Sequence, residues 1–193
     1  MTTIRNFTLF FVTLFGLGFL ATNANAAGKD SGFLIHLVPQ YSNYTIQTTS
    51  DSTQTSLAAE TTLGYLFDMG FALGIRYDLT NSSSTSAGTT TKSDTTMYGP
   101  AVGYFHESGF FGIFSYLLAY TIKTDTTETN GDGMQLDLGW LHRFGSFGLG
   151  AQLSYNSLVQ KKSKNAAGVE TDIDPNTKIS GFGLPSVVFN WVF

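Results

Sequence analysis

Apolar and polar residues alternate one by one through most of this chain, and the alternation recurs in eight separate segments. A period of two places successive side chains on opposite faces, so each segment predicts a β-strand with one apolar face. We expect strands at residues 32–46, 55–67, 71–80, 95–106, 110–123, 134–144, 147–160 and 177–193. The pattern therefore predicts an all-β fold.

The last predicted strand shows the alternation most clearly. The large apolar side chains of Val187, Phe189, Trp191 and Phe193 fall on one of its faces. The printed sequence ends on an aromatic residue, and aromatic rings favour the boundary between a membrane and water. This strand therefore indicates a β-sheet that crosses a membrane.

The connections between the predicted strands form two classes that alternate along the chain. Three are tight and contain glycine, at residues 68–70, 107–109 and 145–146. Four are long and polar, at residues 48–54, 80–94, 124–133 and 161–176. The alternation predicts an eight-stranded antiparallel up-and-down transmembrane β-barrel with all tight turns at one end. In barrels of outer membranes the short turns are periplasmic and the long loops are extracellular.

Pairing across the tight turns supports this prediction. Directly opposite residues of an antiparallel pair share a face. Across residues 145–146, Leu138 then faces Leu153 on the apolar side, and Asp137 faces Ser154 on the polar side. The other two tight turns also join apolar positions to apolar positions, so three separate hairpins agree.

A soluble barrel of the lipocalin kind would show the same alternation with its apolar face inward. Two observations favour the membrane alternative. The polar-face positions of the third and fourth strands are mostly small residues with few charges, which suits the narrow interior of an eight-stranded barrel. Charged residues make up only 12% of the chain, whereas about a quarter is usual in soluble domains.

Aromatic residues of the apolar face are sorted by their position along the strands. Phenylalanines lie beside the tight turns, and tyrosines lie further along. Two rows of aromatic side chains are typical of the two interfaces of a membrane. The predicted second row, which we call the tyrosine girdle, consists of Tyr41, Tyr77, Tyr98, Tyr120 and Tyr155.

Five charged residues fall on the face that we expect to line the barrel interior: Glu60, Arg76, Asp78, Asp137 and Arg143. Glu60 is predicted to lie opposite Asp78 and diagonal to Arg76, so that Arg76 can bridge two acids. Buried charges need partners, and a connected network with nearby Gln, Asn and Ser side chains would supply them. The network predicts a plugged interior or a very narrow water path.

The first 26 residues have the features of a secretory signal peptide that is cleaved on export. Arg5 precedes an apolar run from Phe7 to Ala21, and Ala24 and Ala26 fit the small-residue cleavage rule. We therefore expect a signal peptide at residues 1–26 and an outer-membrane β-barrel at residues 27–193, in a Gram-negative bacterium.

The signal sequence, the alternating strands and connections, and the aromatic C-terminus resemble the small outer-membrane barrels of the OmpA and OmpX type. The resemblance is one of architecture and covers the whole predicted mature chain. It implies that the barrel-assembly machinery recognises the C-terminal strand through Phe189, Trp191 and Phe193. Trp191 stands where tyrosine is common in that family.

Chemistry-bearing motifs are absent from the sequence. The three histidines lie near the predicted tight-turn end and none is paired with a serine at an outer position, so a lipid-modifying enzyme is disfavoured. The acidic segment at residues 125–132 lacks the spacing of a calcium loop. We expect no enzyme activity, no cofactor and no metal. A net charge of −4 gives no signal for nucleic-acid binding.

Two functions remain open. One is a structural or surface-interaction role carried by the extracellular loops, with a loop partner of unknown identity. The alternative is a narrow porin-like channel for ions or small solutes, controlled by the interior charges. We expect outer-membrane lipids and lipopolysaccharide as surroundings, with Lys161, Lys162 and Lys164 near its phosphates, and a monomeric protein.

Overall fold

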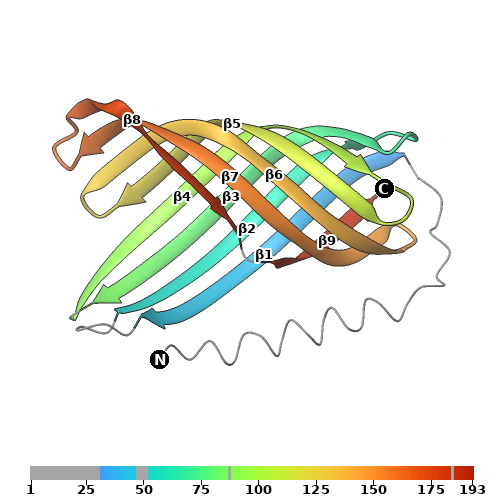
Figure 1. Cartoon of the computed structure of the whole chain (residues 1–193), viewed down its shortest axis with the longest axis horizontal. Coiled ribbons are helices and arrows are strands. Elements are labelled where there is room, and N and C mark those ends of the chain that lie inside the picture. The colour runs from blue at the N-terminus through green and yellow to red at the C-terminus, as the bar shows by residue number, and fades with distance from the viewer. Residues whose placement is uncertain (1–30, 47–51, 87, 184) are drawn as a thin grey trace.

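The computed structural model describes residues 31–46, 52–86, 88–183 and 185–193, so the predicted signal peptide lies outside the described residues. Nine strands are present in the described part: β1 (Gly32–Ile46), β2 (Ser52–Leu66), β3 (Phe71–Ser86), β4 (Thr89–Phe105), β5 (Phe110–Thr124), β6 (Thr127–Phe144), β7 (Phe147–Asn165), β8 (Glu170–Phe182) and β9 (Ser186–Val192). Figure 1 shows them wrapped into a tilted barrel. No helix among the described residues is long and apolar enough to cross a membrane.

Antiparallel neighbours form a ring that closes at the end with the tight turns. Each strand from β1 to β7 pairs with the next, and β9 pairs with both β7 and β1. β8 pairs with β7 alone among the described strands, beyond the part of β7 that pairs with β9. β8 and β9 therefore share one position of an eight-position ring. The predicted last strand at residues 177–193 is in fact two strands, interrupted between Gly183 and Pro185.

The three tight turns lie where the sequence predicts them. Each contains a glycine with positive φ: Gly70 at 82°, Gly109 at 92° and Gly145 at 64°. Residues with a side chain rarely adopt this conformation. We call this end of the barrel the tight-turn end and the opposite end the long-hairpin end. The predicted pairs Leu138–Leu153 and Asp137–Ser154 are confirmed.

The prediction of long loops at the other end is wrong for residues 80–94, 124–133 and 161–176, and residues 48–51 of the first predicted loop lie outside the described residues. Strands β3 and β4 remain paired out to Ser86 and Thr89, and β6 and β7 remain paired out to residues 127 and 165. The Ser/Thr-rich segments are therefore hairpins that extend the barrel strands. β-Branched threonine favours the pleated backbone, and its hydroxyl forms cross-strand hydrogen bonds, as between Thr85 and Thr90 at 2.9 Å.

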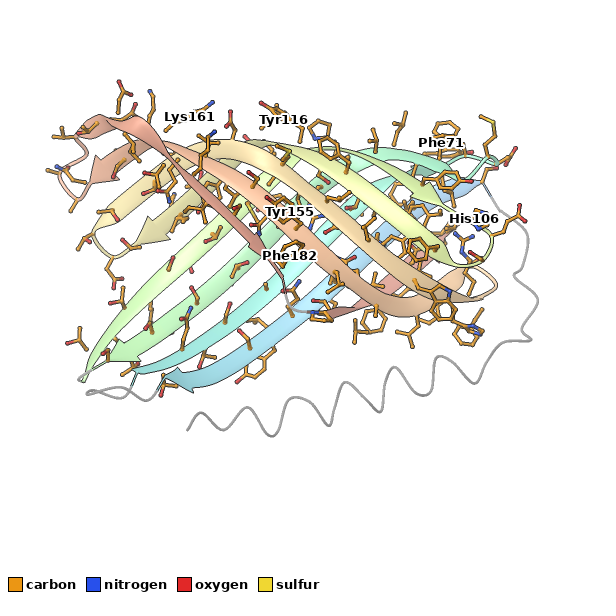
Figure 2. All side chains as sticks on the ribbon, viewed as in Figure 1. Phe71, His106, Tyr116, Tyr155, Lys161 and Phe182 are labelled. Carbon is orange, nitrogen blue, oxygen red and sulfur yellow. The ribbon has the colours of Figure 1, made fainter. Side chains whose placement is uncertain are left out.

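Apolar side chains face outward around the ring, and polar side chains face inward. On β3, Ile75 is 65% exposed, whereas its neighbour Arg76 is 2% exposed. Figure 2 shows the outward ring of Phe71 near the tight-turn end and those of Tyr116 and Tyr155 further along the barrel. This arrangement excludes the lipocalin-like alternative, in which the apolar face would point inward.

The interior is filled in layers. Nearest the tight-turn end is a lower apolar cluster of Leu34, Val38, Leu66, Ala72, Ala101, Phe105, Phe111, Ile113, Leu141, Val188 and Val192. A charged layer around Arg76 follows. Beyond it lies an upper apolar cluster of Leu117, Tyr120 and Leu158, with Met97 and Ile122 packed against them. Side chains rather than a wide pore therefore occupy the lower and middle interior, as expected for a barrel of this strand number.

The prediction that Tyr120 belongs to the tyrosine girdle is wrong. Tyr120 is only 4% exposed and belongs to the upper apolar cluster. The register of β5 with β6 shifts between Leu117 and Tyr120. A β-bulge of this kind inserts extra residues and reverses which face the following residues occupy. The surrounding Tyr116–Tyr120 segment is continuously apolar, so it contains no alternation from which the reversal could be detected.

Candidate functional site

One guanidinium group organises the charged layer. Arg76 on β3 donates from Nε to Oδ2 of Asp78 at 2.5 Å and from Nη2 to Oε2 of Glu60 at 2.5 Å. Its Nη1 donates to Oδ2 of Asp137, which comes from β6 on another part of the ring. Arginine offers five donors in a fixed planar fork, so it can join carboxylates from three strands.

Negative charge is in excess in this layer. Three carboxylates surround one guanidinium, so a fully ionised cluster carries a formal charge of −2. Arg76, Asp78 and Asp137 are at most 2% exposed, and Glu60 is 15% exposed. Ion pairs removed from water require extra hydrogen bonds to offset their desolvation.

Neutral amides supply those hydrogen bonds. Gln40 donates to Glu60 Oε1 at 2.7 Å, and Gln152 donates to Glu60 Oε2 at 3.2 Å. Gln135 donates to Asp137 Oδ1 at 2.9 Å. Together with Arg76, the amides therefore join interior side chains of five strands, β1, β2, β3, β6 and β7.

His36 extends the layer toward the tight-turn end. Its Nε2 lies 2.9 Å from Gln152 Oε1, and its Nδ1 lies 3.3 Å from Asn190 Oδ1 on β9. Its ring meets Phe111 edge-on at 5.1 Å. Neither His36 nor Gln152 was predicted to belong to the network. Both fall on inward-facing positions of the alternating pattern, and that position was the signal in the sequence that could have identified them.

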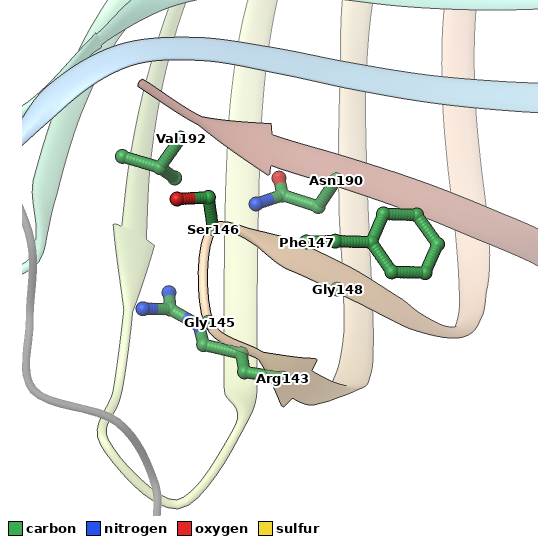
Figure 3. Close-up of a pocket in the computed structure, with 7 residues that line it drawn as sticks. All are labelled: Arg143, Gly145, Ser146, Phe147, Gly148, Asn190 and Val192. Carbon is green, nitrogen blue, oxygen red and sulfur yellow. The ribbon is translucent and has the colours of Figure 1, made fainter.

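Arg143 was predicted to join the network, but the structure places it elsewhere. It lies at the tight-turn end, in a pocket that Figure 3 shows beside Asn190 and Val192. Gly145, Ser146, Phe147 and Gly148 complete the lining. The structure therefore brings four of the five predicted residues, Glu60, Arg76, Asp78 and Asp137, together around one guanidinium group.

Outward aromatic residues lie largely where the sequence predicts. Tyr41, Tyr77, Tyr98 and Tyr155 all point outward and are exposed. In the C-terminal segment, Phe193 is exposed, and Phe189 and Trp191 pack on Phe147 with ring centroids 6.4 and 5.2 Å away. These residues thus form an aromatic patch on β7 and β9 at the tight-turn end.

Two of the three lysines suggested as phosphate contacts are already paired with acids at the long-hairpin end. Lys161 donates to Asp132, and Lys162 donates to Glu170 at 2.5 Å. These hydrogen bonds raise the pKa of each lysine above its usual value. These ion pairs reduce the positive charge that the outer part of β7 presents to an anionic surface.

The sequence from residue 12 to residue 184 matches a family model described as "Outer membrane protein beta-barrel domain". The match spans most of the chain and includes all strands up to β8. No curated protein matches the chain.

Solved structures give weaker likenesses. The chain resembles the β domain of the Bordetella autotransporter BrkA with 15% identity and a TM-score of 0.43, over 79% of this chain and 68% of that one. It resembles the translocator domain of the autotransporter NalP from Neisseria meningitidis with 14% identity and a TM-score of 0.45, over 93% and 70%. OmpT of Vibrio cholerae, an outer membrane protein, shows 14% identity and a TM-score of 0.31, over 84% and 52%.

Proposed function

The chain belongs to the family of outer membrane protein β-barrel domains, and on this premise we propose that it is an integral outer-membrane protein with a closed interior, whose working surface is the set of hairpins at the long-hairpin end. The tight turns face the periplasm and the hairpins face the outside of the cell, as is usual for such barrels. The proposal assigns no catalytic step to the chain.

The observation that carries this proposal is the closure of the interior at the charged layer. Arg76 links carboxylates from β2, β3 and β6, and amides from β1, β6 and β7 complete the cross-section. The lower apolar cluster closes the barrel beneath it. A solute would have to displace both layers to cross, so transport through the interior is disfavoured.

The hairpins offer a surface of a different kind. The β3–β4 hairpin is rich in Ser and Thr, and the β5–β6 and β7–β8 hairpins each carry an ion pair between a lysine and an acid. Backbone pairing holds all three as sheet extensions. A pre-ordered polar surface loses little conformational entropy on binding, which supports a role in surface interaction, in contact with lipopolysaccharide or a further partner.

Single-channel recording on refolded residues 27–193 tests the closed interior. We expect a silent bilayer for the wild type, and new current steps for Arg76→Ala combined with Phe105→Ala and Phe111→Ala, which opens both the charged layer and the lower apolar cluster. Lys123→Ala is the control, because Lys123 is 63% exposed and pairs with Glu128 outside the interior. Discrete steps in the wild-type protein would instead establish the narrow-channel alternative.

Cysteine labelling in intact cells tests the orientation. The chain has no cysteine, so single substitutions give a clean signal. Thr90→Cys in the β3–β4 hairpin should react with a membrane-impermeant maleimide on whole cells. Met69→Cys, in a tight turn and 69% exposed, should react only after the outer membrane is permeabilised. The reverse pattern would overturn the proposed orientation.

A further inference from the structure

The ring of hydrogen bonds is incomplete toward the long-hairpin end. β1 pairs with β9 from Leu34 to Leu37, and β8 pairs with β7 only. Among the described residues no backbone pairing joins β8 to β1. Figure 1 shows β8 and the outer half of β1 diverging from the point where β9 begins. We call this interruption of the wall the seam.

Proline explains why the ladder stops at this point. Phe33 and Phe193 exchange two backbone hydrogen bonds of 3.0 Å. Alternate residues of a strand direct their backbone N–H groups to the same neighbour, so residues 35, 37 and 39 are the next positions of β1 that face β9. Residue 39 is proline, which has no N–H group. The first hydrogen-bonded pair that is missing between β1 and β9 is therefore at a residue that cannot donate.

A second proline lies beside the seam. Of the four prolines in the chain, Pro39 is on β1 and Pro185 lies between β8 and β9. Pro100 and Pro175 instead fall where the registers of β4 with β5 and of β7 with β8 shift. Proline is common on strand edges that do not pair, and Pro39 and Pro185 fit that role at the seam.

An apolar surface inside the barrel reaches the seam. Leu158 on β7 is 6% exposed and belongs to the upper apolar cluster. Its partner on β8 is Ile179, and directly opposite residues share a face, so Ile179 also faces the interior. Ile179 is nevertheless 40% exposed. The interior apolar surface thus continues, uncovered, to the open edge.

Apolar groups also flank the seam on the outside. Tyr41 on β1 is 63% exposed, and Phe182 on β8 is 82% exposed. Phe182 contacts Tyr155 with ring centroids 5.0 Å apart, as Figure 2 shows on the outer face of the barrel. Tyr41 and Tyr155 belong to the tyrosine girdle, which marks one interface of the membrane. The seam therefore opens at the level where acyl chains meet the head groups, next to the apolar surface inside.

We propose that the hydrocarbon chain of a membrane amphiphile enters the barrel through the seam and lies against the upper apolar cluster. The charged layer, where Gln40 of β1 binds Glu60 at 2.7 Å, limits how deep the chain can go. Burial of apolar surface that would otherwise face water drives the binding. That the chain comes from the outer leaflet rests on the proposed orientation, whereas entry through the seam does not.

Contact quenching of tryptophan by lipids with brominated acyl chains tests the proposal in symmetric liposomes. Both native tryptophans are first replaced, by Trp140→Phe and Trp191→Phe. Three separate variants of this background then each carry a single tryptophan at a new position. Tyr120→Trp reports on the upper apolar cluster, Phe105→Trp reports on the lower apolar cluster, and Tyr98→Trp reports on the outer face. We expect Tyr120→Trp to be quenched nearly as strongly as Tyr98→Trp, and Phe105→Trp to be protected.

Restoring the missing donor tests the route. Pro39→Val combined with Pro185→Val supplies N–H groups along the seam, and we expect it to reduce the quenching of Tyr120→Trp while leaving Tyr98→Trp unchanged. Unchanged quenching of Tyr120→Trp would overturn entry through the seam. Equal protection of Tyr120→Trp and Phe105→Trp in the parent background would overturn chain binding altogether. Folding of each variant is checked by its heat-modifiable mobility in gels.

Spin labels test the seam without any ligand. Nitroxides on Tyr41→Cys and Leu57→Cys lie on directly paired residues of β1 and β2 and should show strong dipolar broadening. Nitroxides on Tyr41→Cys and Phe182→Cys should show much weaker broadening if the seam is open. Comparable broadening in the two pairs would mean that β1 and β8 close in the membrane, and the proposal would fail even if the orientation of the barrel were correct.

Discussion

Arg76 and Asp137 form an ion pair across the barrel interior, between β3 and β6, although 61 residues separate them in sequence. No neighbouring-strand ladder connects these two strands, because β4 and β5 lie between them. The contact therefore ties the two sides of the ring together through side chains alone.

Replacing Arg76 with methionine should destabilise the barrel strongly. The change leaves three carboxylates without their cation, and loss of one partner of a buried ion pair costs about 3–5 kcal/mol. The measurement is the urea dependence of unfolding in detergent micelles. Lys123→Met is the matched control, because exposed ion pairs contribute about 0–1 kcal/mol. Equal effects of the two changes would show that the layer does not hold the fold.

Replacing Asp78 with asparagine should cost less than replacing Arg76. The amide oxygen can still accept the hydrogen bond from Arg76 Nε, and the formal charge of the layer falls from −2 to −1. Oδ1 of Asp78 is buried and has no hydrogen-bond partner, so one of its oxygens contributes no bond to lose. We expect a loss of about 1–3 kcal/mol in the same unfolding experiment. Asp78→Leu removes the acceptor and should cost more; an Asp78→Asn variant as unstable as Arg76→Met would contradict the charge argument.

Gly139→Ala should destabilise the protein by overpacking the interior. A Cβ at this position would fall 2.4 Å from the carbonyl oxygen of Ala151 and 2.5 Å from Cζ of Phe111, and such crowding costs about 1–3 kcal/mol. Gly148→Ala is the control on the adjacent strand, where the nearest atom would be 3.5 Å away. Thermal unfolding in detergent compares the two. A control variant less stable than Gly139→Ala would disprove the predicted crowding.

Phe193→Ala should reduce the amount of protein assembled in the outer membrane of cells. The side chain is 70% exposed, so its removal costs little packing, and a large assembly defect would point to recognition by the assembly machinery. Phe144→Ala is the control, with a similarly exposed phenylalanine at the same end. The measurement is the heat-modifiable fraction in purified outer membranes. Equal assembly of both variants would argue against a recognition role for the terminal residue.

The face of each strand and the tight turns could be predicted from sequence because both are local properties. Alternation alone placed Arg76 and Asp78 inside and Ile75 outside, and pairing arithmetic placed Glu60 opposite Asp78, as the structure confirms. The same pairing rule applies only to strands that follow one another in the chain. It could not predict the contact between Asp137 and Arg76, because the distance between β3 and β6 across the interior depends on how the ring closes.

Two errors had a common cause. Tyr120 was placed outside, and residues 80–94 were predicted as a loop. In the first case both faces of the strand are apolar, and in the second case both faces are polar. A period-two pattern is visible only when one face of the strand is apolar and the other is polar. Where both faces have the same polarity, only the backbone hydrogen bonds between strands in the structure reveal a bulge or a strand extension.

Strand pairing in the β3–β4 hairpin out to residues 86 and 89 also affects how other proteins can handle this surface. A protease must draw several residues of extended, unpaired backbone into its cleft, and here the backbone is already engaged on a neighbouring strand. With the proposed orientation, this hairpin should therefore resist digestion on living cells despite its Ser/Thr-rich composition. Antibodies raised against linear Ser/Thr peptides should likewise bind poorly, since the folded epitope alternates between two strands.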